Sequence, residues 1–399
     1  MNEEFLKYDI ICKILNQTVE DAKNTVSGAG KKYFYHYTSM AGFLLMMKDI
    51  REKKCYLFPG NTQYQNDANE LFEGEKFIGD YIEQKNTYDQ TKQLLEKSLN
   101  HFSKNVYIAC FSSDRDMLEQ WKYYGKNCGL SIGFDFNECE GFWKKDAKIS
   151  DDEAYTRKVK INTDAITSLI TNDDELDFSD ADIPMTISYT QKTRKGNNLL
   201  PIEVLYTDDE KKKALEYIIK GYDNDIKKLG LIDSDKSKEI YYNNIIAAFI
   251  PICKNNYFAH EKESRLLFFP TNDTPMLYRE KGSRILPYFK CTIVNKDKDK
   301  LPIKTVTVGP GANQNLVFNA VINMIEGTES GRFYSETICG KKLEEAPWKI
   351  EDISALENDY PERLFCTTKK SGDNIEEKIL VYRSVNGVLI YKSTIPFRD

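Results

Sequence analysis

Histidine is scarce in this chain, and several common sequence signatures are missing. The 399 residues include only three histidines, which almost excludes a metal site built from several imidazoles. The nine cysteines include no C-x-x-C pair, so neither a zinc ribbon nor a thioredoxin-like site is expected. Serine hydrolase (Gly-x-Ser-x-Gly), zinc protease (H-E-x-x-H) and Rossmann (Gly-x-Gly-x-x-Gly) motifs are also absent.

Long apolar runs and targeting signals are lacking as well. No apolar stretch approaches the roughly 18 residues of a membrane-spanning helix, and the N-terminus has neither a basic region nor an apolar one. We therefore expect a cytoplasmic protein with reduced, unmetallated cysteines and no membrane partner. The net charge of −6 does not favour non-specific binding to nucleic acid or anionic membranes.

The composition is that of a globular protein, with 41% hydrophobic, 12% aromatic and 30% charged residues. Short predicted strands are mixed irregularly with helices, which favours an α+β fold with a split mixed or antiparallel sheet and flanking helices. We expect a helical lead-in at 1–30, outside the core, and an α+β core at 31–330 with an acidic insertion near 150–200. A C-terminal extension at 331–399 is expected to pack on the core and to end in a β-hairpin around Asn386-Gly387.

The first candidate site is Tyr35-His36-Tyr37-Thr38, on a predicted strand that runs into a helix capped by Thr38 or Ser39. Alternation along a strand places the two tyrosines on one face and His36 on the other. An imidazole at that position can bind a ribose hydroxyl or a phosphate. The alternative is a structural histidine packed between aromatic residues.

A second candidate is the loop with Asn66, Asp67 and Glu70, which precedes a predicted helix. Helix capping explains these residues fully, and closure over a polar ligand is the functional alternative.

A third candidate follows a predicted strand from Val106 to Phe111 and begins with the hydroxyls of Ser112 and Ser113. Ser113 and Asp116 have the spacing of a capping box for a short helix carrying Trp121, Tyr123 and Tyr124. These aromatic rings can stack on a flat ligand, although burial in the core is the commoner use of such residues.

The fourth candidate is a strand that begins near His260. Alternation places Glu261, Glu263 and Arg265 on one face. They form either a surface ion-pair row or a site in which one carboxylate is aimed at a developing cation and a second group holds it. Glu263 is favoured because it is nearer Arg265, which would keep it ionised.

Taken in order, several short motifs resemble the bacterial domain-of-unknown-function 2971 family. The resemblance spans most of residues 33–399 and implies no activity. The motifs are Y-H-Y-T-S, N-D-x-x-E, C-F-S, W-x-x-Y-G, G-L-S-I-G-F-D, K-x-x-x-F-x-x-E-x-E-x-R (Lys254 to Arg265), V-G-P and a terminal S-x-I-P-F-R.

A more distant resemblance is to the ADP-ribosyltransferase superfamily, which has a strand with a histidine that runs into a helix and a later strand with a key glutamate. The resemblance implies that His36 holds a ribose of NAD and that Glu263 or Glu261 stabilises an oxocarbenium-like state. Trp121, Tyr123 or Tyr124 would stack on nicotinamide. The remaining candidates, Tyr37, Thr38, Asn66, Asp67, Glu70, Ser112 and Arg265, would complete the NAD site.

The expected function is therefore NAD-dependent ADP-ribosyl transfer or NAD cleavage, with a protein or nucleic-acid target, in a toxin-like effector against phage. One alternative is a non-catalytic sensor that binds a nucleotide or a protein. Another is a Mg²⁺-dependent nuclease that uses Asp67, Glu70, Glu261 and Glu263.

Overall fold

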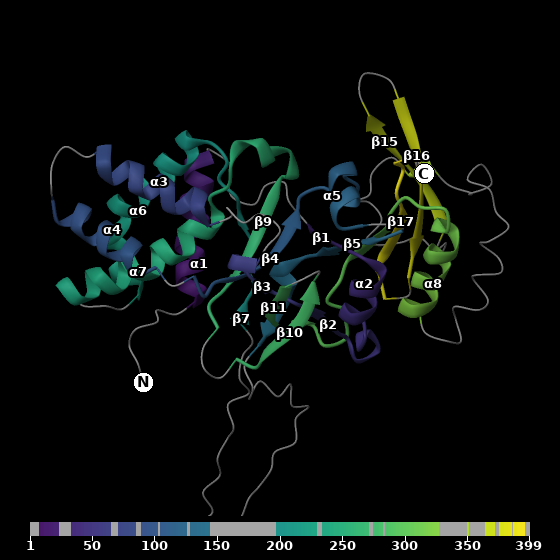
Figure 1. The fold of residues 1–399 in the computed structure, drawn as a ribbon. Coiled ribbons are helices and arrows are strands. Elements are labelled where there is room, and N and C mark those ends of the chain that lie inside the picture. Colours follow the sequence, from purple (N-terminus) through teal and green to yellow (C-terminus); the bar gives the residue numbers. More distant parts are fainter. Residues whose placement is uncertain are drawn as a thin grey trace, which may run out of the picture. The chain divides into compact units, whose positions relative to one another are not determined.

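The computed structural model confirms an α+β fold (Figure 1). The chain divides into two units, residues 1–145 with 196–399 and residues 146–195, and every element described here belongs to the first. The acidic insertion lies outside the described residues. These are residues 8–23, 33–64, 71–84, 89–102, 104–125, 128–143, 197–229, 234–270, 274–281, 284–326, 349–350, 364–371, 375–384 and 386–395.

A mixed sheet of thirteen described strands forms the centre of the fold. At its middle, β4 (Tyr107–Ser112) has the antiparallel strand β9 (Glu263–Phe268) on one edge and β1 (Phe34–Thr38) on the other. The sheet continues from β1 through β5 (Leu130–Phe134) to β13 (Thr305–Val308). The other described members near β4 and β9 are β3 (Gly60–Asn61), β8 (Ile202–Glu203), β10 (Met276–Lys281) and β11 (Arg284–Phe289).

A smaller sheet shares a first hydrophobic core with one face of the main sheet. It contains β2 (Lys54–Leu57), β12 (Cys291–Asn295), β6 (Cys139–Phe142) and β7 (Asn197–Asn198), in that order. Its buried Cys55, Cys291 and Ile293 belong to the same cluster as Phe111 and Phe134 of the main sheet. Helices α2 (Met40–Met46) and α8 (Gln314–Glu326) supply further side chains to this core. Ser39 caps α2 by accepting a hydrogen bond from the amide of Gly42, as the sequence predicts.

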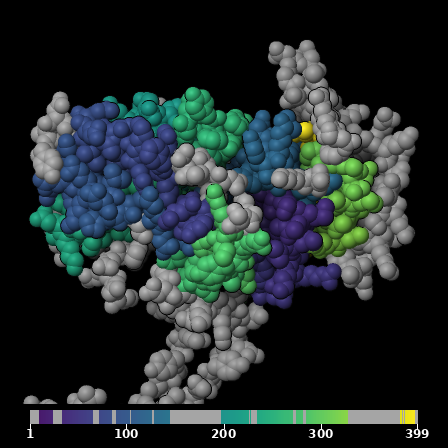
Figure 2. All heavy atoms as spheres, in the orientation of Figure 1, coloured from purple at the N-terminus to yellow at the C-terminus, as the bar shows by residue number. Residues whose placement is uncertain are grey.

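Helices cover the opposite face of β4 and β9 and form the second core. They are α1 (Tyr8–Lys23), α3 (Phe72–Gln84), α4 (Gln90–Asn100), α6 (Asp208–Leu229) and α7 (Asp235–Phe249). Their buried residues form one cluster with Ile108 of β4 and Leu267 of β9. Figure 2 shows this helical layer as a continuous surface of blue and teal atoms. Thr207 and Glu210 form a capping box at the start of α6.

Helix α1 is part of this second core. Leu15 is fully buried, and Ile11 and Val19 are nearly so, because the apolar face of the helix packs on α6 and α7. The expectation that the N-terminal helix lies outside the core is therefore wrong for the described residues 8–23.

The C-terminal strands extend the main sheet. Strand β17 (Leu389–Lys392) pairs in parallel with β13 and antiparallel with β16 (Ile375–Arg383), which confirms the predicted hairpin around Asn386-Gly387. Gly387 has a φ of 75°, the left-handed conformation that favours glycine in such turns. The order continues with β15 (Leu364–Ser371) and β14 (Lys349–Ile350).

Candidate functional site

The pairing of β4 with β9 brings polar residues together above the helical layer. Ser112 lies opposite Glu263, and Cys110 lies opposite Arg265. Directly paired residues of antiparallel strands point to the same face, so these four side chains share the face that the helices cover. Sequence alternation therefore predicts correctly that Glu263 and Arg265 lie together.

Glu263 is held by two cations in a nearly dry environment. Arg265 donates from Nε to Oε1 of Glu263 over 2.8 Å and from Nη2 to Oε2 over 3.0 Å. Lys254 donates to the same Oε2 over 2.9 Å. Arg265 is fully buried and also donates from Nη1 to the carbonyl of Pro251. A bidentate guanidinium pair of this kind fixes both the position and the rotamer of the carboxylate.

Lys254 joins Glu263 to a second carboxylate. Its ammonium donates to Oε2 of Glu261 over 2.6 Å. Glu261 does not lie on the strand, which corrects the expectation from alternation. It ends a short 3₁₀ segment, Asn256–Glu261, and Lys262 follows in the left-handed conformation with a φ of 48°. This turn brings Glu261 back to Lys254 although strand pairing does not place it there.

The two carboxylates differ in whether an oxygen atom remains available to a ligand. The bonds from Arg265 and Lys254 occupy both oxygens of Glu263. Oε1 of Glu261 makes no hydrogen bond with any residue in the described part of the chain, and its side chain is 13% exposed. Glu261 thus has one oxygen held and one oxygen open.

The charges of this cluster stabilise one another. Burial would raise the pKa of Glu263, but the positive charges of Arg265 and Lys254 outweigh burial and hold that pKa below its ordinary value of 4.5. Burial would lower the pKa of Lys254, but Glu263 and Glu261 together raise it above 10.5. Glu263 and Lys254 are therefore both charged at neutral pH.

A pocket of about 300 Å³ opens beside Glu263. This volume is at the lower end for sites that bind small molecules. Its walls come from α1, β8, the loop after β4 and the segment that leads into β9. The lining residues are Lys23, Ser113, Glu203, Tyr206, Ala259, Lys262 and Glu263.

Two of these wall residues, Lys23 and Tyr206, are not predicted as site residues from the sequence. Lys23 ends α1 and donates to Glu203 over 3.3 Å and to the carbonyl of Val204 over 2.8 Å. The hydroxyl of Tyr206 accepts a hydrogen bond from the amide of Glu263 over 2.9 Å. No local motif marks either residue, because long-range packing alone brings them to β9.

His36 lies on the other face of the sheet from Glu263. Tyr35 pairs with Ser112, which pairs with Glu263, so these three side chains point to the same face of the sheet. His36 follows Tyr35 in β1 and therefore points to the opposite face. Its ring contacts Phe111 with centroids 5.5 Å apart. The expectation that His36 shares a cleft with the glutamates is therefore wrong.

His36 is instead tied to the strand beside it. Its Nδ1 lies 2.9 Å from the carbonyl oxygen of Cys110, so Nδ1 carries a proton and donates. Burial lowers the pKa of His36 below its usual value of 6.5, and the ring is neutral at pH 7.

Trp121 and Tyr37 are core residues on the Glu263 face. Trp121 is 3% exposed, and its ring meets that of Tyr37 edge to face with centroids 4.7 Å apart. The Tyr37 hydroxyl donates to the carbonyl of Asp114 and accepts from the amide of Met117. This geometry does not support the interpretation of Trp121 as a stacking platform.

Asp116 has a different role from the predicted cap. Helix α5 (Leu118–Tyr123) begins after Met117 with no side-chain cap. The carboxylate of Asp116 instead accepts a hydrogen bond from Trp121 Nε1 over 2.8 Å and others from Ser393 and Thr394. The W-x-x-Y-G and S-x-I-P-F-R motifs therefore meet, and the Ser113–Asp116 capping box does not form.

Of the three predicted stacking residues, Tyr123 and Tyr124 are exposed, with 67% and 42% of their surface accessible to solvent. Burial of its phenol raises the pKa of Tyr124 above 10, and the nearby Cys110, Glu263 and Glu261 add to the rise. Tyr124 is thus the aromatic candidate beside the carboxylates.

Of the remaining predicted site residues, Ser112 and Thr38 make local structural contacts, and the others lie outside the described part of the chain. Ser112 Oγ donates to the carbonyl of Glu261 over 3.1 Å and accepts from the amide of Asp114 over 3.2 Å, so it ties two loops together. Thr38 ends β1 and packs beside Gly42. Asn66, Asp67 and Glu70 lie outside the described residues.

Metal binding at the carboxylates has little support from their geometry. The Lys254 ammonium binds both Glu261 and Glu263, at the place where a bridging cation would have to sit. Among the residues that the structure describes, no group of three or more potential ligands is placed to hold a metal ion. The seven cysteines whose side chains the structure describes are all free thiols.

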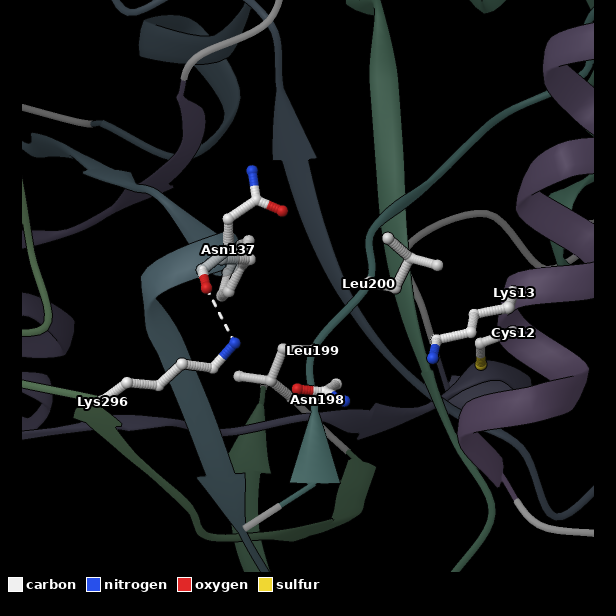
Figure 3. Close-up of a pocket in the computed structure, with 8 residues that line it drawn as sticks. Cys12, Lys13, Asn137, Asn198, Leu199, Leu200 and Lys296 are labelled. Atoms are coloured by element: carbon white, nitrogen blue, oxygen red, sulfur yellow. Dashed lines mark hydrogen bonds between the residues drawn. The ribbon is translucent and has the colours of Figure 1, made fainter. Parts of the chain in front are cut away.

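A second pocket, of about 160 Å³, lies between α1 and the small sheet (Figure 3). Lys296 reaches in from one side but donates to the carbonyl of Asn137 over 2.7 Å, and Lys13 comes from α1 on the other side. The wall also contains the apolar Leu199 and Leu200, and none of its described residues carries a carboxylate. This second pocket therefore has fewer charged side chains able to bind or activate a substrate than the Glu263 pocket.

None of the described helices combines the length and the apolar character that crossing a bilayer requires. No curated protein and no solved structure matches the chain. Residues 120–266 match a sequence family described as "Protein of unknown function (DUF2971)". The matched range contains Trp121, Lys254, Glu261, Glu263 and Arg265, and the match supports the family resemblance that the sequence motifs indicate.

Proposed function

We propose that this chain carries out NAD-dependent ADP-ribosyl transfer or NAD cleavage at the Glu261–Lys254–Glu263 cluster. The observation that carries the proposal is the unequal pair of carboxylates. Glu263 is fixed by Arg265 and Lys254, whereas Glu261 has Oε2 held by Lys254 and Oε1 open. A catalytic carboxylate needs such support together with a free oxygen aimed at the reacting group.

In the proposed reaction, the bond between C1′ of the ribose and the nicotinamide nitrogen breaks, and its electron pair leaves with nicotinamide. Positive charge develops on C1′ and the ring oxygen of the ribose. The Glu261 carboxylate stabilises this charge without reorganising, because Lys254 already holds it in place. Water or an acceptor group then attacks C1′ and loses its proton to solvent. In this assignment Glu263 is a positioning residue and Glu261 is the catalytic one.

The second candidate function is a non-catalytic sensor that binds a nucleotide in the same pocket. Both oxygens of the Glu263 carboxylate already accept hydrogen bonds, and this favours the sensor. A carboxylate with no free oxygen contributes to a rigid binding surface more readily than to catalysis.

Incubation of the protein with NAD separates these functions. Nicotinamide release is followed by chromatography, and NAD binding is followed by calorimetry. Release supports the enzyme, and binding without release supports the sensor. If the protein neither binds nor cleaves NAD, both proposals fail.

The cellular setting is a proposal that rests on the resemblances and on the composition. We propose a cytoplasmic, toxin-like effector against phage that modifies a protein or a nucleic acid. Expression of the wild type in bacteria should then slow growth, and Glu261→Gln should relieve the effect. Equal toxicity of the two would contradict the proposal.

A further inference from the structure

We propose that the pocket beside Glu263 is a phosphate subsite, in which Tyr206, Lys262 and Ser113 bind the oxygens of a phosphate or pyrophosphate group. The inference rests on the proposed function, in that this group would be the pyrophosphate of NAD. Three features of the pocket carry it: a buried donor, a surplus of positive charge and a constrained loop that presents a lysine.

The buried donor is the Tyr206 hydroxyl. Tyr206 is 7% exposed, and its oxygen accepts the hydrogen bond from the amide of Glu263. The hydroxyl proton has no acceptor among the residues that the structure describes. A buried O–H without an acceptor is costly, and an acceptor on a bound ligand satisfies it. Burial raises the pKa of Tyr206, so this donor stays protonated at neutral pH.

The acceptors in the pocket wall are already used by cations. Glu203 pairs with Lys23 at 3.3 Å, and Glu263 pairs with Lys254 and Arg265. The wall therefore offers donors to a ligand, which selects a group rich in acceptors. Among the described residues, the charged wall residues and their ion partners leave one positive charge, because four cations face three carboxylates: Lys23, Lys254, Lys262 and Arg265 against Glu203, Glu261 and Glu263.

Ser113, which directly follows β4, and Lys262, which directly precedes β9, both line the pocket. The carbonyl of Lys262 accepts a hydrogen bond from the amide of Ser113 over 3.2 Å. Lys262 has a left-handed backbone with a φ of 48°, its side chain is exposed, and it forms no ion pair within the described residues. An ammonium and a hydroxyl beside the Tyr206 donor give three donors for one anionic group.

The subsite would hold the phosphates next to the carboxylate cluster. Glu263 belongs to both, because it lines the pocket and shares Lys254 with Glu261. A dinucleotide with its pyrophosphate in the pocket could thus present a ribose to Glu261.

The test is a calorimetric titration with inorganic pyrophosphate. We expect saturable binding by the wild type and a loss of affinity of about tenfold in both Tyr206→Phe and Lys262→Gln, since each variant removes a hydrogen bond to an ionised group. Tyr257→Phe and Lys220→Gln are matched controls. Tyr257 is 87% exposed, neither residue lines the pocket, and both variants should bind as the wild type does. Thermal melting of every variant checks that the fold is intact.

Three further arms identify the source of the phosphate and separate the two proposals. ADP-ribose should bind with the same dependence on Tyr206 and Lys262, whereas nicotinamide riboside, which has no phosphate, should be insensitive to both changes. Absence of pyrophosphate binding, or equal affinity in folded variants and wild type, would overturn the subsite. Binding that depends on Tyr206 and Lys262 without any cleavage of NAD would leave the subsite standing and remove the enzymatic proposal.

Discussion

Two glutamates that are two positions apart in the chain have different surroundings, and the difference suggests separate duties. Glu263 is 6% exposed, and its carboxylate receives three hydrogen bonds from Arg265 and Lys254. Glu261 receives one hydrogen bond from Lys254. Substitution of Glu263 should therefore affect mainly stability, and substitution of Glu261 should affect mainly activity.

Glu263→Gln should lower the free energy of unfolding by about 3 kcal/mol or more, because it leaves the buried charge of Arg265 without its counterion. Urea denaturation measures this effect. Glu239→Gln is a matched control, since Glu239 pairs with Lys97 at the surface and should change stability by about 1 kcal/mol at most. Equal midpoints for both variants would show that the buried pair is not important for stability.

The stability supplied by Glu263 should depend on pH in one direction. Its pKa is lower in the folded protein than its ordinary value of 4.5, so its contribution is present above that pH and is lost as the pH falls through the folded pKa. The difference in unfolding free energy between wild type and Glu263→Gln should thus shrink between pH 7 and about pH 3. Denaturation curves at several pH values measure it, and a difference that does not change with pH would contradict the assigned pKa.

At the scale of elements, several family-like motifs meet around one indole ring. A Cβ added to Gly309 would lie 2.8 Å from two ring carbons of Trp121, and one added to Gly125 would lie 2.3 Å from the same ring. The V-G-P and W-x-x-Y-G motifs therefore supply glycines that let the backbone approach Trp121. These motifs have a structural explanation that requires no ligand.

Gly309→Ala should destabilise the protein by about 1–3 kcal/mol, because the added methyl group overpacks the indole site. Gly79→Ala is the control. Gly79 lies within α3, and a Cβ there would meet nothing within 4 Å. Alanine at that position should stabilise the helix by about 0.5–1 kcal/mol. Thermal melting compares the two variants, and similar melting temperatures would contradict the packing described for Trp121.

The elements themselves can be predicted from local sequence to a large extent. Alternation locates β1, β4 and β9 within a residue or two, and the turn at Asn386-Gly387 follows from its residue types. The face of each strand also follows from alternation, but the pairing of strands does not. For this reason the sequence cannot show that Tyr35, rather than His36, shares a face with Glu263.

Contacts made over long sequence separations complete the site. Lys23 and Tyr206 reach Glu203 and Glu263 from distant elements, and nothing in their local sequence indicates this. Lys254, by contrast, is only nine residues from Glu263 in the chain. Glu261 reaches Lys254 only because Lys262 adopts a left-handed backbone, which residue type alone does not predict.

At the scale of the whole molecule, the N-terminal helix joins core and site. Its side chains complete the second core, and Lys23 at its end lines the Glu263 pocket. Leu15→Ala should lower the free energy of unfolding by about 2–5 kcal/mol, because Leu15 is fully buried. Gln17→Ala, on the exposed side of the helix, should have little effect. Equal stability of the two variants in urea would mean that α1 is dispensable to the core.

The central claim is that the Glu261 carboxylate is catalytic and that Lys254 positions it. The most direct measurement is the rate of nicotinamide release from NAD by wild type and Glu261→Gln, each checked for an unchanged melting temperature. Gln keeps the size of Glu and removes its charge, so the rate should fall about a hundredfold or more while the fold is retained. A folded Glu261→Gln protein that releases nicotinamide at the wild-type rate would contradict the claim.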